Sequence, residues 1–102
     1  VLPGRSACLH CLDLTRTDLD PGWPAIAAQL DRRPRGAVPC DGVLAAQVAS
    51  QAALQVLALL EGDSPASVGG TLELELPGWQ WRRRSWPVHP GCPCAWGVAV
   101  PA

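Results

Sequence analysis

The chain has 102 residues, which is enough for one domain with a modest core and too few for two independent domains. Its net charge of -1 argues against a general polyanion binder, and all eight cationic residues are arginine, which excludes lysine-based catalysis within this segment. The chain begins at Val1, contains no methionine and shows no charged-then-apolar leader, so we expect a piece excised from a longer protein, with no secretion signal.

The first third of the chain is predicted to hold one short helix among loops. Residues 1–7, VLPGRSA, read as a strand end or loop that leads into a closely spaced pair of cysteines. Residues 13–22 are polar and turn-prone, and a short helix is expected over residues 24–30, with Pro24 in its first turn. Residues 32–42, RRPRGAVPCDG, form a loop by composition.

A long buried helix is predicted over residues 42–61. Nothing in GVLAAQVASQAALQVLALL breaks a helix, and alanine, leucine and glutamine, all good helix formers, dominate it. Nearly all of its surface is apolar, so we expect a larger body outside these residues to pack on it. One narrow stripe is polar and consists of Gln47, Ser50, Gln51 and Gln55. This stripe and the many alanines disfavour the alternative, a membrane span, and Gly62 is expected to end the helix.

A β-hairpin is predicted over residues 71–86. TLELEL alternates strictly between leucine and polar residues, which is the period of a half-buried strand, and Pro77-Gly78 turns the chain back into WQWRRRSW. A two-residue or a four-residue loop gives the same antiparallel register, in which Leu76 faces Trp79, Leu74 faces Trp81, Glu73 faces Arg82 and Thr71 faces Arg84.

The arginine run inside this hairpin has two interpretations. Arginines between tryptophans are typical of proteins that bind single-stranded nucleic acid. Glu73 and Glu75 lie opposite the arginines in the predicted register, however, and so favour a solvent face of salt bridges. We therefore expect no nucleic-acid partner, and no membrane partner.

Four of the five cysteines form two tight pairs near the ends of the chain: Cys8, Cys11, Cys92 and Cys94. Residues 8–11 have the spacing of a zinc knuckle, and residues 89–94 would supply the other half of a tetrahedral site. The odd count and the tight pairing favour a metal site over a disulfide framework in a cytosolic protein, and no thioredoxin-like pattern supports a redox pair. We predict a structural zinc ion with four thiolates; replacement of one thiolate by His10 or His89 is a less favoured alternative.

Cys40 belongs to neither cysteine pair and lies in a loop flanked by proline and glycine, just before the long helix. One interpretation is a buried structural thiol at the start of that helix. The other is a catalytic nucleophile, whose thiolate would be favoured by the positive end of the helix dipole. On the residues alone the structural interpretation is favoured, and the catalytic one stays open.

Taken in order, CLHCLDL, CDGVLAAQVASQAALQVLALLEG and HPGCPC resemble the C-terminal part of the ThiF/MoeB/HesA proteins, relatives of the ubiquitin-activating enzymes, over nearly the whole chain. In that family two cysteine pairs hold a structural zinc ion, and a cysteine followed by a Gly-Val segment opens a long helix. The resemblance implies that residues 40–44 open this helix and that the zinc ligands are Cys8, Cys11, Cys92 and Cys94. The implied fold class is an α/β fragment, the C-terminal part of a ThiF-like Rossmann-type domain whose nucleotide-binding half is absent from these residues.

The hairpin rich in arginine and tryptophan, with the tight second cysteine pair, looks most like the ThiF-like proteins of thiazole/oxazole-modified peptide clusters. Those proteins are cyclodehydratase components or leader-peptide-binding proteins of bacteriocin-type biosynthesis. The resemblance implies a bacterial, cytoplasmic protein that binds or presents a precursor peptide to a YcaO-type enzyme. That enzyme uses ATP to convert cysteine, serine or threonine residues of the precursor into azoline rings.

Two alternative functions stay open beside this one. In the first alternative, the parent protein is an active adenylyltransferase. It would use ATP and Mg²⁺ to activate a C-terminal carboxylate, either for sulfur transfer or for formation of a thioester at Cys40. The second is a non-enzymatic, zinc-bound interaction module. No Gly-x-Gly-x-x-Gly occurs in these residues, so the segment alone cannot adenylate a substrate, and both the enzymatic status of the parent and a homodimer through the parent domain are left open.

Overall fold

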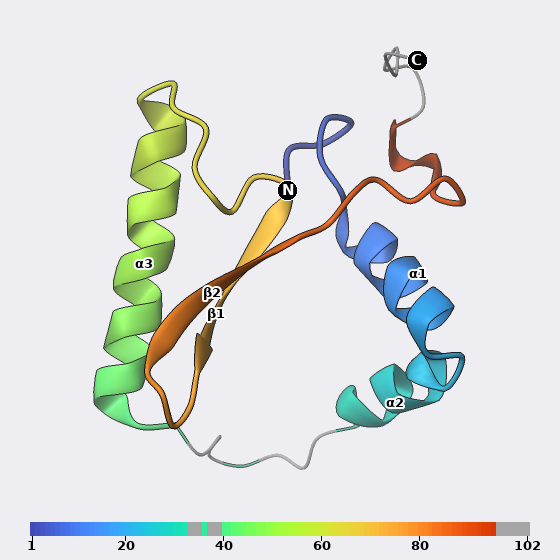
Figure 1. Cartoon of the computed structure of the whole chain (residues 1–102), viewed down its shortest axis with the longest axis horizontal. Helices are drawn as coiled ribbons and strands as arrows, with labels where there is room; N and C mark the ends of the chain where they lie inside the picture. The colour runs from blue at the N-terminus through green and yellow to red at the C-terminus, as the bar shows by residue number, and fades with distance from the viewer. Residues whose placement is uncertain (33–35, 37–39, 96–102) are drawn as a thin grey trace.

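The computed structural model describes residues 1–32, 36 and 40–95, which form a small α/β structure with three α-helices and one antiparallel hairpin. In chain order the elements are α1 (Leu9–Leu19), α2 (Trp23–Leu30), α3 (Gly42–Leu60), β1 (Gly70–Glu75), β2 (Gln80–Ser85) and a short 3₁₀ helix (Pro93–Ala95). The hairpin runs through the middle, with α3 on one side and the pair of α1 and α2 on the other (Figure 1). The segment that follows β2 leads back to the start of α1.

Helix α1 occupies most of the polar stretch that was predicted to be turn-prone, residues 13–22, so that prediction is wrong. The reason lies in residues that face the core at helical spacing: Cys11 is buried, and Leu14, three residues later, packs against the same core. Because Cys11 is predicted to be a metal ligand, it is not counted among the apolar residues whose spacing would indicate a helix. The polar residues on the outer face support the helix locally, because Arg16 lies 4.0 Å from the Asp13 carboxylate one turn earlier.

Helix α2 is present where a short helix was predicted, beginning one residue earlier at Trp23 and carrying Pro24 in its first turn. Two side chains of α1 hold it in place. Nε1 of Trp23 donates a hydrogen bond to Oδ1 of Asp13 at 3.1 Å, and the guanidinium carbon of Arg16 lies 4.9 Å from the centroid of the Trp23 ring. No residue of α2 is buried, so these polar and cation–π contacts are important in joining the two helices.

Helix α3 runs over Gly42–Leu60, one residue shorter than the predicted range 42–61. Asp41 caps its start, since a carboxylate oxygen accepts a hydrogen bond from the backbone N–H of Val43 at 2.8 Å. Gly62 ends it in the left-handed conformation, with φ of 88°. The backbone N–H groups of Gly62 and Asp63 donate to the carbonyls of residues 59 and 58 at 3.1 and 3.0 Å, which is a Schellman motif.

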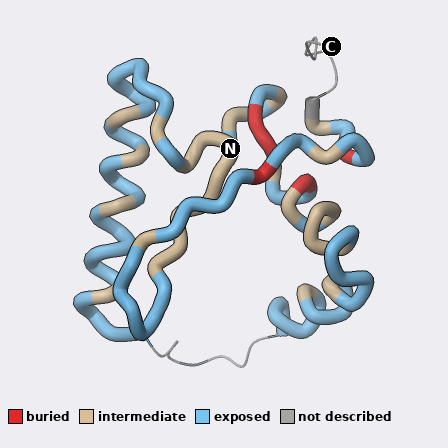
Figure 2. The backbone as a smooth tube through the Cα atoms, in the orientation of Figure 1, coloured by how far each residue is buried: buried red, intermediate tan, exposed pale blue. Residues whose placement is uncertain are grey.

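The burial predicted for this helix is not found in the described residues, because no residue of α3 is buried (Figure 2). A groove of about 300 Å³ separates α3 from the hairpin and is lined by Val48 and Val56 on one side and by Leu72 and Trp81 on the other. By length and composition alone α3 is apolar enough to cross a membrane. Packing of a larger body on α3 stays a prediction.

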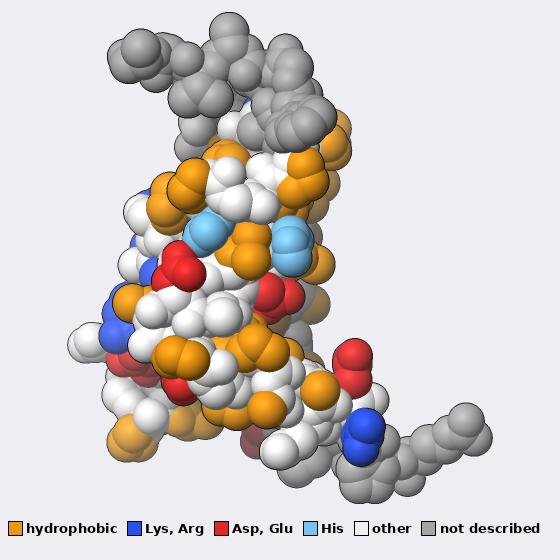
Figure 3. All heavy atoms as spheres, turned by 90° about the vertical axis from the view of Figure 1, so that its right-hand side faces the viewer, with side chains coloured by type: hydrophobic (Ala, Val, Ile, Leu, Met, Phe, Trp, Pro, Cys, Tyr) orange, Lys and Arg blue, Asp and Glu red, His pale blue; other side chains and the backbone are white. Residues whose placement is uncertain are grey.

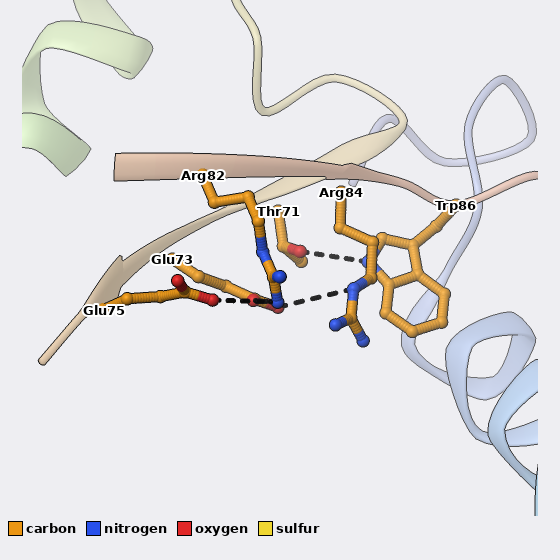
Figure 4. A network of polar contacts seen from close by, with 6 residues as sticks. All are labelled: Thr71, Glu73, Glu75, Arg82, Arg84 and Trp86. Carbon is orange, nitrogen blue, oxygen red and sulfur yellow. Dashed lines mark hydrogen bonds and ion pairs between the residues drawn. The ribbon is translucent and has the colours of Figure 1, made fainter. Parts of the chain in front are cut away.

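The hairpin has the predicted register, with Leu74 opposite Trp81 and Glu73 opposite Arg82. Its loop is the four-residue form, so residues 76–79 lie in the turn rather than in the ladder. The predicted salt-bridged face is also confirmed: the Arg82 guanidinium lies 3.3 Å from Glu73 and 3.0 Å from Glu75 (Figure 4). These side chains are half-exposed, so each ion pair adds little to the free energy of unfolding.

The buried residues of the described chain gather where its first and last segments meet (Figure 2). They are Ser6, Ala7, Cys11, Trp86 and Cys92, and the partly buried Cys8, Leu12, Leu14 and Cys94 pack against them. Trp86 is the largest of the buried side chains, and its Nε1 donates a hydrogen bond to Oγ1 of Thr71 at 3.0 Å. The small core is therefore built around the cysteine pairs, and the hairpin is joined to it through this tryptophan.

Candidate metal centre

The two cysteine pairs meet although they lie near opposite ends of the chain. Cys8 precedes the first turn of α1 and Cys11 lies within it, while Cys92 and Cys94 lie on the turn after β2 and in the 3₁₀ helix. The Sγ atoms of Cys8 and Cys92 are 3.6 Å apart across 84 positions of sequence, and those of Cys11 and Cys94 are 3.4 Å apart across 83. The tertiary fold thus brings one thiol of each pair against one thiol of the other.

The four sulfur atoms have the dimensions of a tetrahedral metal site. All of them lie within 4.8 Å of one another, and the Sγ atoms of Cys8 and Cys11 are 3.7 Å apart. A tetrahedron with zinc–sulfur bonds of about 2.3 Å has sulfur–sulfur edges of about 3.8 Å, close to these distances. All four thiols are free rather than joined in disulfides. The cluster can therefore hold a metal ion, and its all-sulfur donor set suits a soft or borderline ion.

The first pair is shifted toward the thiolate form. A backbone hydrogen bond from Cys11 is the largest cause that lowers the pKa of Cys8. Burial raises the pKa of the Cys11 thiol, but backbone hydrogen bonds from His89 and Cys8, together with the thiols of the second pair, outweigh burial and lower this pKa to about 7. These backbone N–H groups are donors that a metal-bound thiolate also needs.

The second pair is shifted in the opposite direction. Hydrogen bonding to the Cys11 thiol, followed by burial, raises the pKa of Cys94 to about 12. A backbone hydrogen bond from Cys94 lowers the pKa of Cys92, but burial and the thiols of Cys8 and Cys11 outweigh it, so the net shift is upward. Four sulfur atoms this close cannot all be ionised without a cation, so the cluster keeps protons on the second pair that a metal ion would displace.

The surroundings of the cluster shield it on the side of the hairpin. Cys11 is fully buried and Cys92 is 8% exposed, and both pack with the Trp86 indole in the same core. The guanidinium carbons of Arg16 and Arg84 lie 4.9 and 5.6 Å from the centroid of the Trp86 ring, so the indole is held between α1 and β2. Sequence reasoning did not identify Trp86 as part of the site, because its contact with the cysteines is tertiary.

Neither histidine joins the four-cysteine cluster. Both ring nitrogens of His89 are engaged elsewhere: Nε2 lies 2.7 Å from Oδ2 of Asp18, and Nδ1 accepts a hydrogen bond from the Gly91 N–H at 2.9 Å. His10 is exposed on α1. The arrangement therefore favours four thiolates over a site in which a histidine replaces one of them.

Cys40 lies apart from this cluster. It is exposed, so the interpretation as a buried structural thiol is wrong. In the part of the chain that the structure describes, its Sγ donates one hydrogen bond, to the Asp41 carbonyl at 3.5 Å, and Asp41 itself occupies the N-cap of α3. The predicted loop over residues 32–42 falls partly outside the described residues. A catalytic role for Cys40 stays a prediction.

The described residues form a small α/β structure whose first and last segments meet at a four-cysteine cluster that can hold a metal ion. No protein-family model, no curated protein and no solved structure matches this chain. The geometry of the cluster and the order of the motifs therefore carry the functional argument.

Proposed function

We propose that one structural zinc ion is bound by Cys8, Cys11, Cys92 and Cys94. The observation that carries the proposal is the meeting of four sulfur atoms within 4.8 Å of one another. When bound, zinc would act as a cross-link whose apparent binding free energy is on the order of 10 kcal/mol. Four thiolates fill its coordination sphere, so it would offer no open position to water or substrate.

The chain's own residues prepare this role in three ways. The start of α1 holds one thiol pair at fixed spacing, and backbone N–H groups favour its thiolates. The turn after β2 presents the second pair, with the Cys92 N–H donating to the His89 carbonyl at 3.0 Å. Trp86 packs in the same buried core as Cys11 and Cys92. The bound zinc ion would thus be a cross-link that fixes α1 and the hairpin relative to each other.

We further propose that this cross-linked unit is the C-terminal part of a ThiF-like protein of the bacterial cytoplasm. In this proposal the parent protein binds a precursor peptide, or presents it to a YcaO-type cyclodehydratase, in the biosynthesis of azole-modified, bacteriocin-type peptides. The order of the motifs supports this proposal, because it is the order found in the family that the chain resembles. The motifs are a thiol pair, a Cys-Asp-Gly-Val helix start, a long helix, a hairpin and a second thiol pair. The exposed apolar surface of α3 fits a segment that packs on the rest of a larger domain.

Metal content and thiol titration test the first proposal. We expect one zinc per chain in the wild type and in Cys40→Ser, which leaves the cluster intact, and less than one in Cys92→Ser. Zinc absent from the purified wild type after reconstitution under reducing conditions would refute the site. Zinc lost in Cys40→Ser instead would refute the assignment of ligands.

Peptide binding tests the second proposal. The longest natural chain that contains this segment should bind a fluorescently labelled precursor peptide encoded beside its gene, and fluorescence anisotropy measures the affinity. A scrambled peptide of the same composition is the control. Failure to bind any such precursor, together with ATP–pyrophosphate exchange, would favour the adenylyltransferase alternative and overturn the scaffold proposal.

A further inference from the structure

The turn that carries the second thiol pair has an attachment to α1 other than the cysteines. Nε2 of His89, three residues before Cys92, lies 2.7 Å from Oδ2 of Asp18 in the last turns of α1, across 71 positions of sequence. The His89 side chain is only 17% exposed, whereas that of Asp18 is 68% exposed. Figure 3 shows the side of the molecule on which α1 lies, where histidine and acidic side chains lie among hydrophobic ones.

The partners of His89 define which ring nitrogen carries the proton. The Gly91 N–H donates a hydrogen bond to Nδ1 at 2.9 Å, so Nδ1 is the acceptor. The ring proton then lies on Nε2 and is donated to the Asp18 carboxylate. Gly91 also makes room for the ring, because a Cβ at this position would lie 3.1 Å from Nδ1 and 3.3 Å from Cε1. The imidazole is thus fixed from both sides.

The backbone of the same residue contacts one cysteine of each pair. The His89 carbonyl accepts a hydrogen bond from the Cys92 N–H at 3.0 Å. A backbone hydrogen bond from His89 also acts on the Cys11 thiol and is one of the causes that lower its pKa. The backbone of His89 is therefore bonded to both halves of the cluster.

We infer that Asp18 and His89 are positioning residues of the metal centre, and that the hydrogen-bonded series Asp18, His89 and Gly91 holds the second thiol pair in reach of the first. The inference rests on the proposed metal site. Asp18 is seven residues after Cys11, about 10 Å along α1. The turn is thus attached to α1 at two separated points, the sulfur cluster and the Asp18 carboxylate. Two points fix the orientation of a turn where one would let it pivot.

Competition between the protein and a chromophoric chelator for zinc tests this inference on the whole chain. Asp18→Ala and His89→Ala should each weaken zinc affinity about 10- to 100-fold, the usual effect of losing a partner that orients ligands. Asp18→Asn should recover most of the affinity, because an amide oxygen accepts the same N–H. The double variant should be no weaker than the single ones, since both remove one interaction.

Matched controls and a spectroscopic readout separate positioning from general stability. Asp31→Ala and Asp63→Ala remove exposed carboxylates that follow the ends of α2 and α3, outside the turn and helix that carry the cysteines; both should keep wild-type affinity. The Co²⁺ complexes of all variants should retain the absorption of a tetrahedral thiolate site, which shows that the four ligands are intact. A lost Co²⁺ spectrum in Asp18→Asn would overturn the inference.

The outcomes distinguish this inference from the proposal on which it rests. If the wild type binds zinc and Asp18→Ala and His89→Ala bind it within about twofold of wild type, the positioning role is refuted and the metal site stands. The role is also refuted if Asp18→Asn is as weak as Asp18→Ala. A wild type that binds neither zinc nor Co²⁺ would refute both.

Discussion

Removal of the proposed zinc ion should unfold one half of this molecule and leave the other half helical. Bringing Cys8 and Cys92 together closes a loop across 84 positions. The chain entropy of closing a loop of this length costs about 4.5 kcal/mol at 25 °C. The free energy of zinc binding, on the order of 10 kcal/mol, exceeds that cost. Burial of the few side chains around the cluster does not give a comparable excess of free energy.

The structure also indicates which signal should be lost. Helices α1 and α2 contain 11 and 8 residues, and α3 contains 19. In the part of the chain that the structure describes, α3 makes no close backbone contact with α1, α2 or the hairpin, so it should keep its helix when the thiol cluster opens. Far-ultraviolet circular dichroism at the helical minimum should therefore fall by about half on removal of zinc.

The assay compares the zinc-loaded wild type, the wild type after chelation under reducing conditions, and Cys92→Ser. Cys40→Ser is the matched control, because it removes a cysteine outside the cluster and should keep the full signal. Tryptophan fluorescence should change in parallel, since Trp86 is buried against the cysteines. If metal analysis shows that zinc is gone while ellipticity and fluorescence are unchanged, the cluster does not hold the fold together and the reasoning is refuted.

Zinc affinity should rise with pH and fall on acidification, because the raised pKa values of Cys92 and Cys94, the latter about 12, mean that binding near neutral pH releases at least two protons. Calorimetry in buffers of different ionisation enthalpy counts these protons, and a pH-independent affinity would contradict the prediction. Gly62→Ala should cost α3 about 1 kcal/mol, since φ of 88° strains any side chain, and urea titration of helicity should show this with zinc affinity unchanged. Trp86→Phe should cost about 1 kcal/mol through loss of the hydrogen bond to Thr71, measured by denaturation of the zinc form; equal stability would show that this bond adds nothing.

The elements that could be predicted are those whose signal is local. The run of good helix formers between Asp41 and Gly62 predicts α3, and the strict alternation of TLELEL predicts a strand and its register with the following segment. The sequence pattern does not predict helix α1, because the residues on its inward face, Cys11 among them, are ones that the pattern assigns to metal binding or to turns. Its exposed surface carries Leu9 and Leu19 beside the polar residues, so the leucines of this stretch show no clear period of 3.6.

The side chains that can bind a metal could be identified from the amino-acid sequence, since two tight cysteine pairs are a chemical property of the chain. The sequence also determined the long helix and the hairpin, because these depend on neighbours a few residues apart. That the pairs meet, that Trp86 packs in their core and that Asp18 is bonded to His89 follow from the tertiary fold. Each of these contacts joins residues separated by about 70 positions or more of sequence or different elements, and periodicity carries no information over such a distance.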